Sequence, residues 1–324
     1  MKKFSKLLIA GALALSAIAA PFTQAVYAEG ESNSSSDQPT SATWIQVTPV
    51  SARVILKPGT EVDYSMIVSN VGSEAFDFSV YAAPYTIVDE AYNVSFSNET
   101  NRSQIVRWIK FINDDGSLTD TYNGSVEAGG KKAVNYRVSV PEDVPAGGQY
   151  ATLFAQTKVD DSNVETSGLK TVSRIGMVVY GRTDGETDDS AEIAEYNVPG
   201  FLLNGPVSVN SLIKNTGNTD FEARYKLTVK SIVGEELYSA EEAYNILPDT
   251  ARREELTWEN TQMMGIFQIN YRVEALGEVR DETRVVIILP LFMIIIIITL
   301  LTIIIVWIIM LIRKRKERKS RLVV

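Results

Sequence analysis

An uninterrupted apolar run near the C-terminus constrains this chain more than any other feature. Residues 285–312 contain no charged side chain, and the run exceeds the roughly 18 apolar residues that indicate a membrane span. A core helix of a soluble domain would keep one polar face, whereas only Thr299 and Thr302 interrupt this run. The sequence therefore predicts a transmembrane helix over residues 285–312.

The flanks of this run predict its orientation. Residues 313–324 carry seven Lys and Arg against one Glu, and basic residues beside a span stay in the cytoplasm. Residues 1–28 have a basic start, an apolar stretch and small residues before Ala28, which is typical of a signal peptide. The Ser-rich residues 29–43 read as a disordered spacer. We therefore expect a single-pass cell-membrane protein with its N-terminus outside and a basic cytoplasmic tail.

The composition of the exported part excludes several classes of function. Without the three basic residues of the signal and the charges of the tail, 21 Lys and Arg stand against 39 Asp and Glu, a net charge of −18. Such a surface does not suit nucleic acid, which needs a basic footprint. The chain has no Cys and no His, which excludes disulfides, Ser-His-Asp triads, Cys nucleophiles and His/Cys zinc sites. We expect no cofactor and no enzymatic activity.

Period-two alternation predicts an all-β fold. Apolar residues alternate with polar ones around residues 62–68, 76–80, 134–140, 221–229 and 267–273, as in strands with one buried face. Residues 150–158 are apolar on both faces, and residues 169–180 are expected to return antiparallel beside them. The acidic, turn-rich residues 183–191 are predicted to be a linker. We expect two tandem immunoglobulin-like β-sandwiches, residues 44–182 and 192–284.

Landmarks recur in the same order in the two halves. Asn70-Val71-Gly72 followed by Phe76 is matched by Asn215-Thr216-Gly217 followed by Phe221 at the same spacing. An Asn-x-Gly turn before a strand opened by an aromatic is typical of sandwich hairpins. Each half also has a turn with basic residues before a strand, and a later strand entered through Gly-x-aromatic. These matches predict two related immunoglobulin-like units.

The whole architecture resembles the WxL-interacting cell-surface proteins of Gram-positive bacteria. The residues that carry the resemblance are the segments 47–50 (VTPV), 56–59 (LKPG), 68–70 (VSN), 141–145 and 147–151 (GGQYA). The first domain of that family is described as peptidoglycan-binding and the second as host-binding. The resemblance therefore implies a surface protein that binds a cell-wall polymer, such as peptidoglycan or an associated glycan, or another exported protein.

Trp108 and Lys110 are the candidate binding residues. In an extended segment Ile105, Ile109 and Phe111 would face the core, so Trp108 would fall on the opposite face beside Lys110. An exposed indole suits glycan or protein contacts, although a buried sandwich Trp is the alternative.

Acidic pairs are the other candidate groups. Glycosidases need only two carboxylates at a set separation, and three Asp pairs occur, at residues 114–115, 160–161 and 188–189. Their turn-like surroundings favour surface acids instead. Asp184, Glu186 and Asp188 alternate as in a calcium loop that lacks its bidentate Glu.

Three functions remain open at this point. The leading one is a non-catalytic, membrane-anchored surface protein that docks to wall polymer or to another exported protein. The alternative is a membrane-tethered scaffold or β-sandwich chaperone that offers an edge strand to a client during surface-protein assembly. A carboxylate-based glycan hydrolase comes third.

Overall fold

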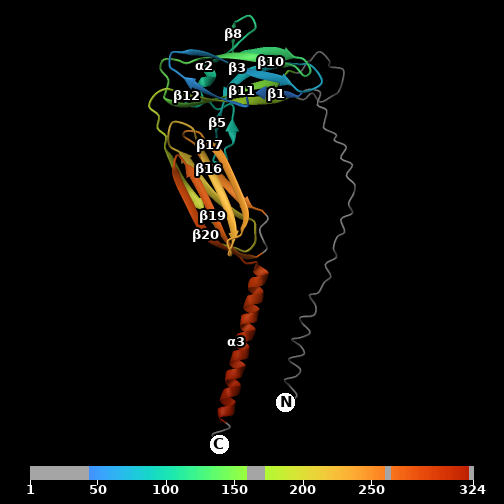
Figure 1. The fold of residues 1–324 in the computed structure, drawn as a ribbon, viewed down its shortest axis with the longest axis vertical. Coiled ribbons are helices and arrows are strands. Elements are labelled where there is room, and N and C mark those ends of the chain that lie inside the picture. Colours follow the sequence, from blue (N-terminus) through green and yellow to red (C-terminus); the bar gives the residue numbers. More distant parts are fainter. Residues whose placement is uncertain (1–43, 159–171, 260–263, 321–324) are drawn as a thin grey trace. The chain divides into compact units, whose positions relative to one another are not determined.

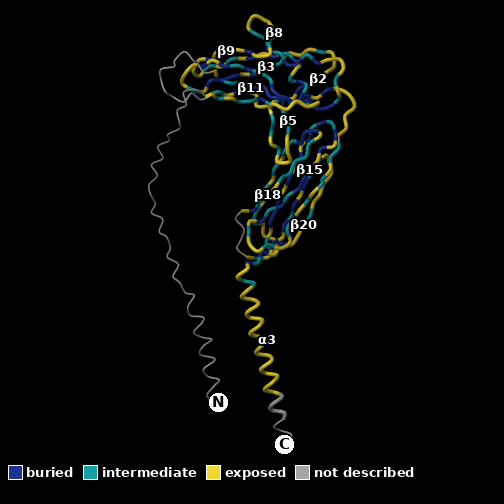
Figure 2. Tube along the Cα trace, turned by 180° about the vertical axis from the view of Figure 1, so that it is seen from behind, coloured by how far each residue is buried: buried dark blue, intermediate teal, exposed yellow. Residues whose placement is uncertain are grey.

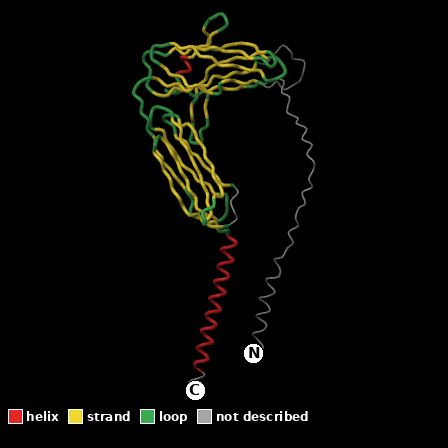
Figure 3. The backbone as a smooth tube through the Cα atoms, in the orientation of Figure 1, coloured by secondary structure: helices red, strands yellow, loops and turns green. Residues whose placement is uncertain are grey.

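A computed structural model describes residues 44–158, 172–259 and 264–320 of the chain, with side chains up to residue 315. The predicted signal peptide and spacer lie outside these residues. The described chain is all-β, apart from one short helix and one long apolar helix near the C-terminus (Figures 1 and 3). The all-β fold class with a C-terminal helix is therefore confirmed.

The first half of the chain, residues 44–183, contains twelve strands and the short helix. Their bounds are β1 (Ile45–Thr48), β2 (Ser51–Leu56), β3 (Glu61–Asn70), β4 (Phe76–Pro84), β5 (Thr86–Ile87), β6 (Val94–Ser95), α2 (Ile105–Trp108), β7 (Ile109–Ile112), β8 (Leu118–Thr119), β9 (Thr121–Val126), β10 (Lys131–Ser139), β11 (Gly147–Thr157) and β12 (Arg174–Thr183). They form two five-stranded sheets, β1-β3-β10-β7-β8 and β2-β12-β11-β4-β9, and the small hairpin β5–β6.

The second half, residues 191–288, contains eight strands and is followed by the long helix. Their bounds are β13 (Ala191–Asn197), β14 (Phe201–Leu202), β15 (Val207–Asn215), β16 (Phe221–Ser231), β17 (Glu236–Ile246), β18 (Ala251–Trp258), β19 (Gly265–Ala275), β20 (Glu278–Ile288) and α3 (Leu291–Ser320). The two sheets are β13-β15-β18 and β14-β20-β19-β16-β17.

The two halves share one strand connectivity. In each, the first strand pairs antiparallel in one sheet, β1 with β3 and β13 with β15. The next strand then crosses to the other sheet and pairs parallel with that half's last strand, β2 with β12 and β14 with β20. The first half differs by an insertion between β4 and β9, which contains β5, β6, α2, β7 and β8. The repeated landmarks in the sequence thus correspond to the same positions in space.

Each half buries its own apolar cluster (Figure 2). The predicted alternation is confirmed on β10, where Val134, Tyr136 and Val138 are buried, and on β19, where every second residue from Phe267 to Val273 is buried. The continuous apolar strand β11 is buried on both faces almost throughout and pairs antiparallel with β12, as the sequence predicts.

A buried asparagine ties together the two sheet-crossing turns of each half. Asn70 Nδ2 donates to the carbonyl oxygens of Glu74 (2.7 Å) and Val126 (3.3 Å), and its Oδ1 accepts from Gly72 N (2.9 Å). Asn215 repeats this pattern in the second half.

In the second half, Asn215 Nδ2 donates to the carbonyl oxygens of Thr219 (2.7 Å) and Ile246 (2.9 Å), and Oδ1 accepts from Gly217 N (3.0 Å). Both asparagines are buried, so these hydrogen bonds form away from water. A buried amide must find such partners, because leaving them unmade costs about 1–3 kcal/mol per group. The Asn-x-Gly signature is therefore a structural requirement of the repeat.

The long helix begins later than the sequence predicts. Residues 285–288 belong to β20 and pair with β19, with Val286 and Ile288 buried. Helix α3 begins at Leu291, and the carbonyl of Pro290 accepts the first helical hydrogen bonds, from Met293 N and Ile294 N. The prediction of a helix from residue 285 is wrong because an uncharged apolar run reads the same in a half-buried strand and in a membrane helix.

We expect the Asn215 hydrogen bonds to carry a measurable share of stability. Asn215→Ala should lower the free energy of unfolding of the full chain in detergent by about 2–4 kcal/mol, because two carbonyls and one amide lose their partner. Asn215→Asp should be more destabilising at neutral than at acidic pH, because a carboxylate facing two carbonyl oxygens must be protonated to donate. Near-UV circular dichroism during urea unfolding at two pH values measures both effects.

The exposed Asn123 on β9 provides the control. Asn123→Ala should change the unfolding free energy by less than about 0.5 kcal/mol. Equal effects at Asn215 and Asn123 would contradict the structural role of the buried amide.

Candidate functional site at the junction of the two halves

Residues 184–190, predicted as part of a linker, connect β12 to β13 and are bonded to the turn after β15. Asn218 Oδ1 accepts from Asp188 N (2.9 Å), and its Nδ2 donates to Glu186 O (3.0 Å). The amide of Gly217 donates to Ser190 O (3.1 Å). A Cβ on Gly217 would lie 2.2 Å from Asp188 O, so only glycine allows this approach. The segment is thus held by the second half.

The same turn contacts the first half through its backbone. Gly148 N donates to Asn218 O at 2.8 Å. The preceding Gly147 has φ +112°, and a Cβ there would lie 2.2 Å from Asn218 O. Glycine is therefore required both by the backbone conformation and by the close approach.

A buried tyrosine joins the halves beside this contact. The Tyr150 hydroxyl donates to Asp220 Oδ1 (3.1 Å), and Asp220 Oδ2 accepts from Arg53 (2.9 Å). Burial, followed by the nearby Asp220 charge, raises the pKa of Tyr150 above its ordinary value, so the phenol stays protonated and donates. The guanidinium of Arg53 also lies 5.0 Å from the ring centre of Tyr180.

The β5–β6 hairpin of the insertion makes the second set of contacts. Tyr92 has φ +64° at the hairpin tip, and its hydroxyl accepts from Leu247 N (2.6 Å) and lies 3.1 Å from Thr250 Oγ1. The guanidinium of Arg252 lies 4.4 Å from the Tyr92 ring centre. Together these contacts fix the hairpin onto the turn that precedes β18.

An ion pair at the edge of this contact adds less. Arg253 donates to Glu90 Oε2 (2.9 Å) and to Glu195 Oε2 (2.6 Å). These carboxylates are about half exposed, and exposed pairs contribute about 0–1 kcal/mol. The backbone bond from Arg253 N to Glu90 O (2.8 Å) does more, because it occupies the free edge of β18.

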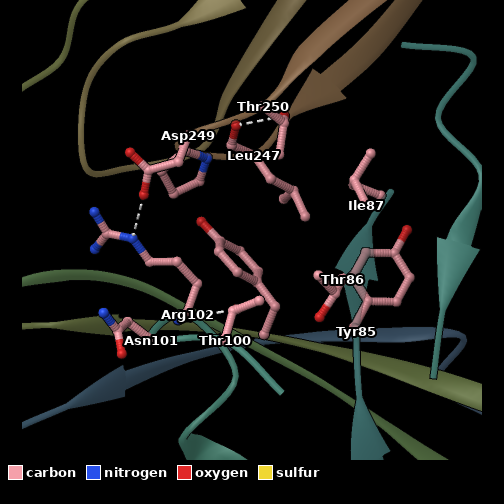
Figure 4. A pocket seen from close by; sticks show the side chains of 11 residues that line it. Tyr85, Thr86, Ile87, Thr100, Asn101, Arg102, Leu247, Asp249 and Thr250 are labelled. Atoms are coloured by element: carbon pink, nitrogen blue, oxygen red, sulfur yellow. Dashed lines mark hydrogen bonds and ion pairs between the residues drawn. The ribbon is translucent and has the colours of Figure 1, made fainter. Parts of the chain in front are cut away.

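A cavity of about 260 Å³ lies between these contacts (Figure 4). Its walls come from both halves, and Arg102 crosses it to pair with Asp249 at 3.0 Å. Burial and the neighbouring Tyr180 and Tyr92 raise the pKa of Tyr85, another lining residue, to about 12. The cavity therefore presents neutral phenols and a neutralised ion pair, a set that suits hydrogen bonding to a ligand or to water.

The titrating groups give no support to acid–base chemistry. Among the described carboxyl groups, every resolved shift lowers the pKa: Asp63, Asp89, Asp114, Asp115 and Glu195. Lys132 beside Asp114 and Ser117 beside Asp115 are the chief causes for the first predicted acidic pair. A general acid needs a raised pKa, so these groups are surface carboxylates.

The structure gives no support to the remaining acidic candidates that it describes. Residues 160–161 lie outside the described residues. Asp188 and Asp189 bond to the Asn215–Asp220 turn through Asp188 N and the Asp189 carboxylate. Within residues 44–158, 172–259 and 264–320, no group of three or more acidic side chains is placed to hold a metal ion.

Trp108 is buried, so its predicted exposure is wrong. Its exposed fraction is 8%, and it belongs to the first apolar cluster with Ile105. The strand alternation that placed it outside fails because residues 105–108 form a helical turn, α2, in which positions three apart share a face. The indole is therefore a core residue and gives no support to its predicted binding role.

Lys110 is partly exposed on β7, but its charge is paired. It bonds to Asp120, and its cross-strand neighbour Arg137 bonds to Asp63 at 2.6 Å. The positive charges of Lys110 and Arg137 are thus neutralised within the fold.

Sequence reasoning missed the junction residues Tyr92, Arg102, Tyr150 and Asp249. Each lies in a loop or strand end far from its partner in sequence, and Tyr92 contacts Thr250 over a separation of 158 residues. The one signal was the pair Gly147-Gly148, where a strand entry with two glycines indicates close backbone approach.

No family model matches the sequence, and no curated protein matches it. Among solved structures, the chain is similar to the class 5 fimbriae chaperone CfaA, with 15% identity, coverage of 76% of this chain and 100% of that chain, and a TM-score of 0.36. The chain is also similar to the E. coli chaperone DraB, with 10% identity, coverage of 75% of this chain and 97% of that chain, and a TM-score of 0.36. A chain of the CsuC–CsuE chaperone–tip adhesion subunit complex of Acinetobacter baumannii is similar at 11% identity, with coverage of 75% of this chain and 98% of that chain and a TM-score of 0.36. At these TM-scores the similarity carries no functional argument.

We expect the Tyr92 hydroxyl to contribute more to the stability of the junction than the Arg253–Glu90 ion pair does. Tyr92→Phe should cost about 1–2 kcal/mol, because the amide of the buried Leu247 loses its acceptor. Glu90→Gln should cost less than about 1 kcal/mol, because the pair is exposed. Hydrogen exchange of the Leu247 amide should accelerate about tenfold per 1.4 kcal/mol in the first variant.

Exchange on β10, far from the hairpin contacts, is the internal control and should not change. Equal acceleration in both variants would show that the hydroxyl does not hold the junction.

Proposed function

We propose that this protein is a non-catalytic, membrane-anchored binding protein of the cell surface that offers an edge strand, β17, to an extended segment of an exported partner. This is the scaffold or chaperone alternative of the sequence analysis. It leaves aside a wall-polymer site at Trp108 and Lys110, which the burial of the indole and the pairing of the lysine do not favour. An exported protein partner also fits the resemblance to WxL-interacting proteins.

The observation that carries the proposal is the free edge of β17. The strand has eleven residues, pairs only with β16 within the described residues, and contains no Pro, Gly or Lys. One edge of its backbone therefore presents unpaired N–H and C=O groups, which are the groups that bind an added strand. It keeps a regular register from Tyr238 to Ile246.

The other long edges are obstructed. The β18 edge is occupied by the bond from Arg253 N to Glu90 O, and β13 is interrupted by a bulge between Ile193 and Glu195. β14 pairs only with the last two residues of β20, so the rest of β20 has an unpaired edge. In that part, charged side chains face the opposite sheet, and inward-pointing charges are a common protection of sheet edges. These side chains are Glu278, Arg280, Glu282 and Arg284. β9, the counterpart of β17 in the first half, has only six residues.

The charge of β17 selects among partners. Glu236, Glu241 and Glu242 lie on it, and only Glu241 has a described cationic partner, Lys226 at 3.0 Å. Pairing β17 with a second copy of itself would bring glutamates together, which disfavours self-association. An extended segment with alternating apolar and basic residues is the complementary partner.

We propose further that α3 anchors the protein with its N-terminal part outside the membrane. The described chain has one helix long and apolar enough to cross a membrane, and its most apolar window has no residue buried against protein. Such a helix needs an apolar solvent on all sides. Its last described side chains, Arg313, Lys314 and Arg315, support a cytoplasmic C-terminal end.

Photo-crosslinking in intact cells tests the edge strand. A photoreactive amino acid at Ala243, exposed on β17, should give a discrete adduct with an exported protein, and mass spectrometry should map it to an extended segment with basic residues. Glu241→Lys with Glu242→Lys should reduce the adduct by reversing the charge of the edge.

The matched control is Ala128, an exposed alanine in the turn after β9. The same adducts at Ala128 and Ala243, or no adduct at Ala243, would remove β17 as the binding element.

Cysteine labelling tests the orientation, because the natural chain has no cysteine. A membrane-impermeant thiol reagent added to intact cells should label Val50→Cys in the first half, and should label Lys314→Cys only after the membrane is disrupted. The reverse pattern would overturn the proposed orientation.

A further inference from the structure

The exposed apolar side chains of the second half gather at one end. Ten large apolar side chains between residues 191 and 288 are exposed in the described chain, and eight of them lie within a few residues of the end from which α3 leaves. We call this set the apolar tip: Phe201, Leu203, Ile232, Val233, Met264, Ile266, Val285 and Ile287. Exposed apolar residues normally occur singly, whereas a contiguous group marks a contact surface.

Strand register places these residues together. Phe201 on β14 and Ile266 on β19 both pair with Ile287 on β20. The turn that carries Ile232 and Val233 follows Ser231, which pairs with Phe267. Their position beside the last residues of β20 therefore does not depend on the direction that α3 takes.

The tip is also uncharged. Residues 201–205, 232–234 and 264–266 contain no Asp, Glu, Lys or Arg, on a chain whose exported part is strongly acidic. Val233 is 83% exposed and Ile232 is 64% exposed, so the most prominent turn of the tip is also its most apolar. Water is a poor solvent for such a turn, and a charged partner gains nothing there.

The length of the link to α3 identifies what covers the tip. Only Leu289 and Pro290 separate β20 from α3, and Leu289 N donates to Leu202 O at 2.9 Å. Because that hydrogen bond fixes Leu289 to Leu202, only the two peptide steps from Leu289 to Leu291 are free, and they span at most about 7 Å. The headgroup layer on each side of a bilayer is about 5–8 Å thick, so this link does not lift the tip above the layer.

The length of the helix gives the same result. The apolar part of α3, from Leu291 to Ile312, is about 33 Å long at 1.5 Å per residue. A hydrocarbon core of about 30 Å uses nearly all of it. Leu291 must therefore lie at the outer boundary of the core, with no helical turn left over to raise the second half above the lipid.

We propose that the apolar tip is a lipid-contacting surface that inserts its side chains into the interfacial layer of the bilayer. This inference rests on the proposed membrane anchoring by α3 and adds a second point of membrane contact. Because the side chains of the tip are uncharged and the exposed Glu235 and Glu236 that follow its turn are negative, the contact depends on apolar burial and is not strengthened by anionic lipid. A rigid second half held at two points would keep a fixed tilt on the membrane.

Nitroxide labelling of single-cysteine variants of the full chain tests this. In vesicles of phosphatidylcholine alone, collision rates with oxygen and with a water-soluble nickel chelate are compared at Val233→Cys, at Leu203→Cys, at Val50→Cys in the first half and at Ile303→Cys in α3. Both tip labels should collide several-fold less with the nickel chelate than the label at residue 50, and more with oxygen. Adding anionic lipid should not strengthen this protection.

The label at residue 303 separates the two proposals. If it reports the bilayer interior while both tip labels match residue 50, anchoring stands and the lipid contact is wrong. If residue 303 is itself in water, anchoring fails and the lipid contact fails with it. Tip labels that are exposed in vesicles but protected in native membranes would assign the tip to a protein partner and would equally overturn the lipid contact.

Discussion

Each half of this molecule depends on one buried asparagine. A two-sheet sandwich requires its chain to cross from one sheet to the other, and here the turns after β3 and β9, or after β15 and β17, make two of these crossings. Asn70 is the last residue of β3, and Asn215 is the last residue of β15. Each bonds to both turns of its half through its side chain and its backbone amide. Because the chain has no cysteine, no disulfide can hold these turns together. Buried hydrogen bonds do so instead, and each is stronger there than in water.

The junction is built on the turn that Asn215 holds. The backbone amide of Asn215 donates to Thr250 O, and the same turn receives Tyr92 and Arg102 from the first half. A mobile turn would give these side chains no fixed partner. The insertion in the first half thus docks onto a turn that the second half holds in place, and residues from both halves line the cavity between them.

The asymmetry between the two halves supports a division of roles. The first half carries the insertion that docks onto its neighbour, while the second half keeps the long free edge of β17. This strand begins beside the turn of the apolar tip and ends at Ile246, one residue before the junction. With the proposed membrane anchoring by α3, a segment bound along β17 would extend from the membrane-proximal end toward the first half.

The sequence by itself determined most of the strands and the repetition of their landmarks. The alternation of apolar residues in Val134–Val138 and in Phe267–Val273 depends only on the spacing of neighbouring residues, and so do the Asn-x-Gly signatures. Such local patterns can be recognised without knowledge of the tertiary structure. Tertiary structure decided the rest. Trp108 became a core residue because one helical turn reversed its face, and residues 285–288 became a strand because β19 was there to pair with them. Tyr92, Tyr150 and Asp249 gained partners 70 to 158 residues away. Such contacts are set by how the halves close, and no local pattern encodes them.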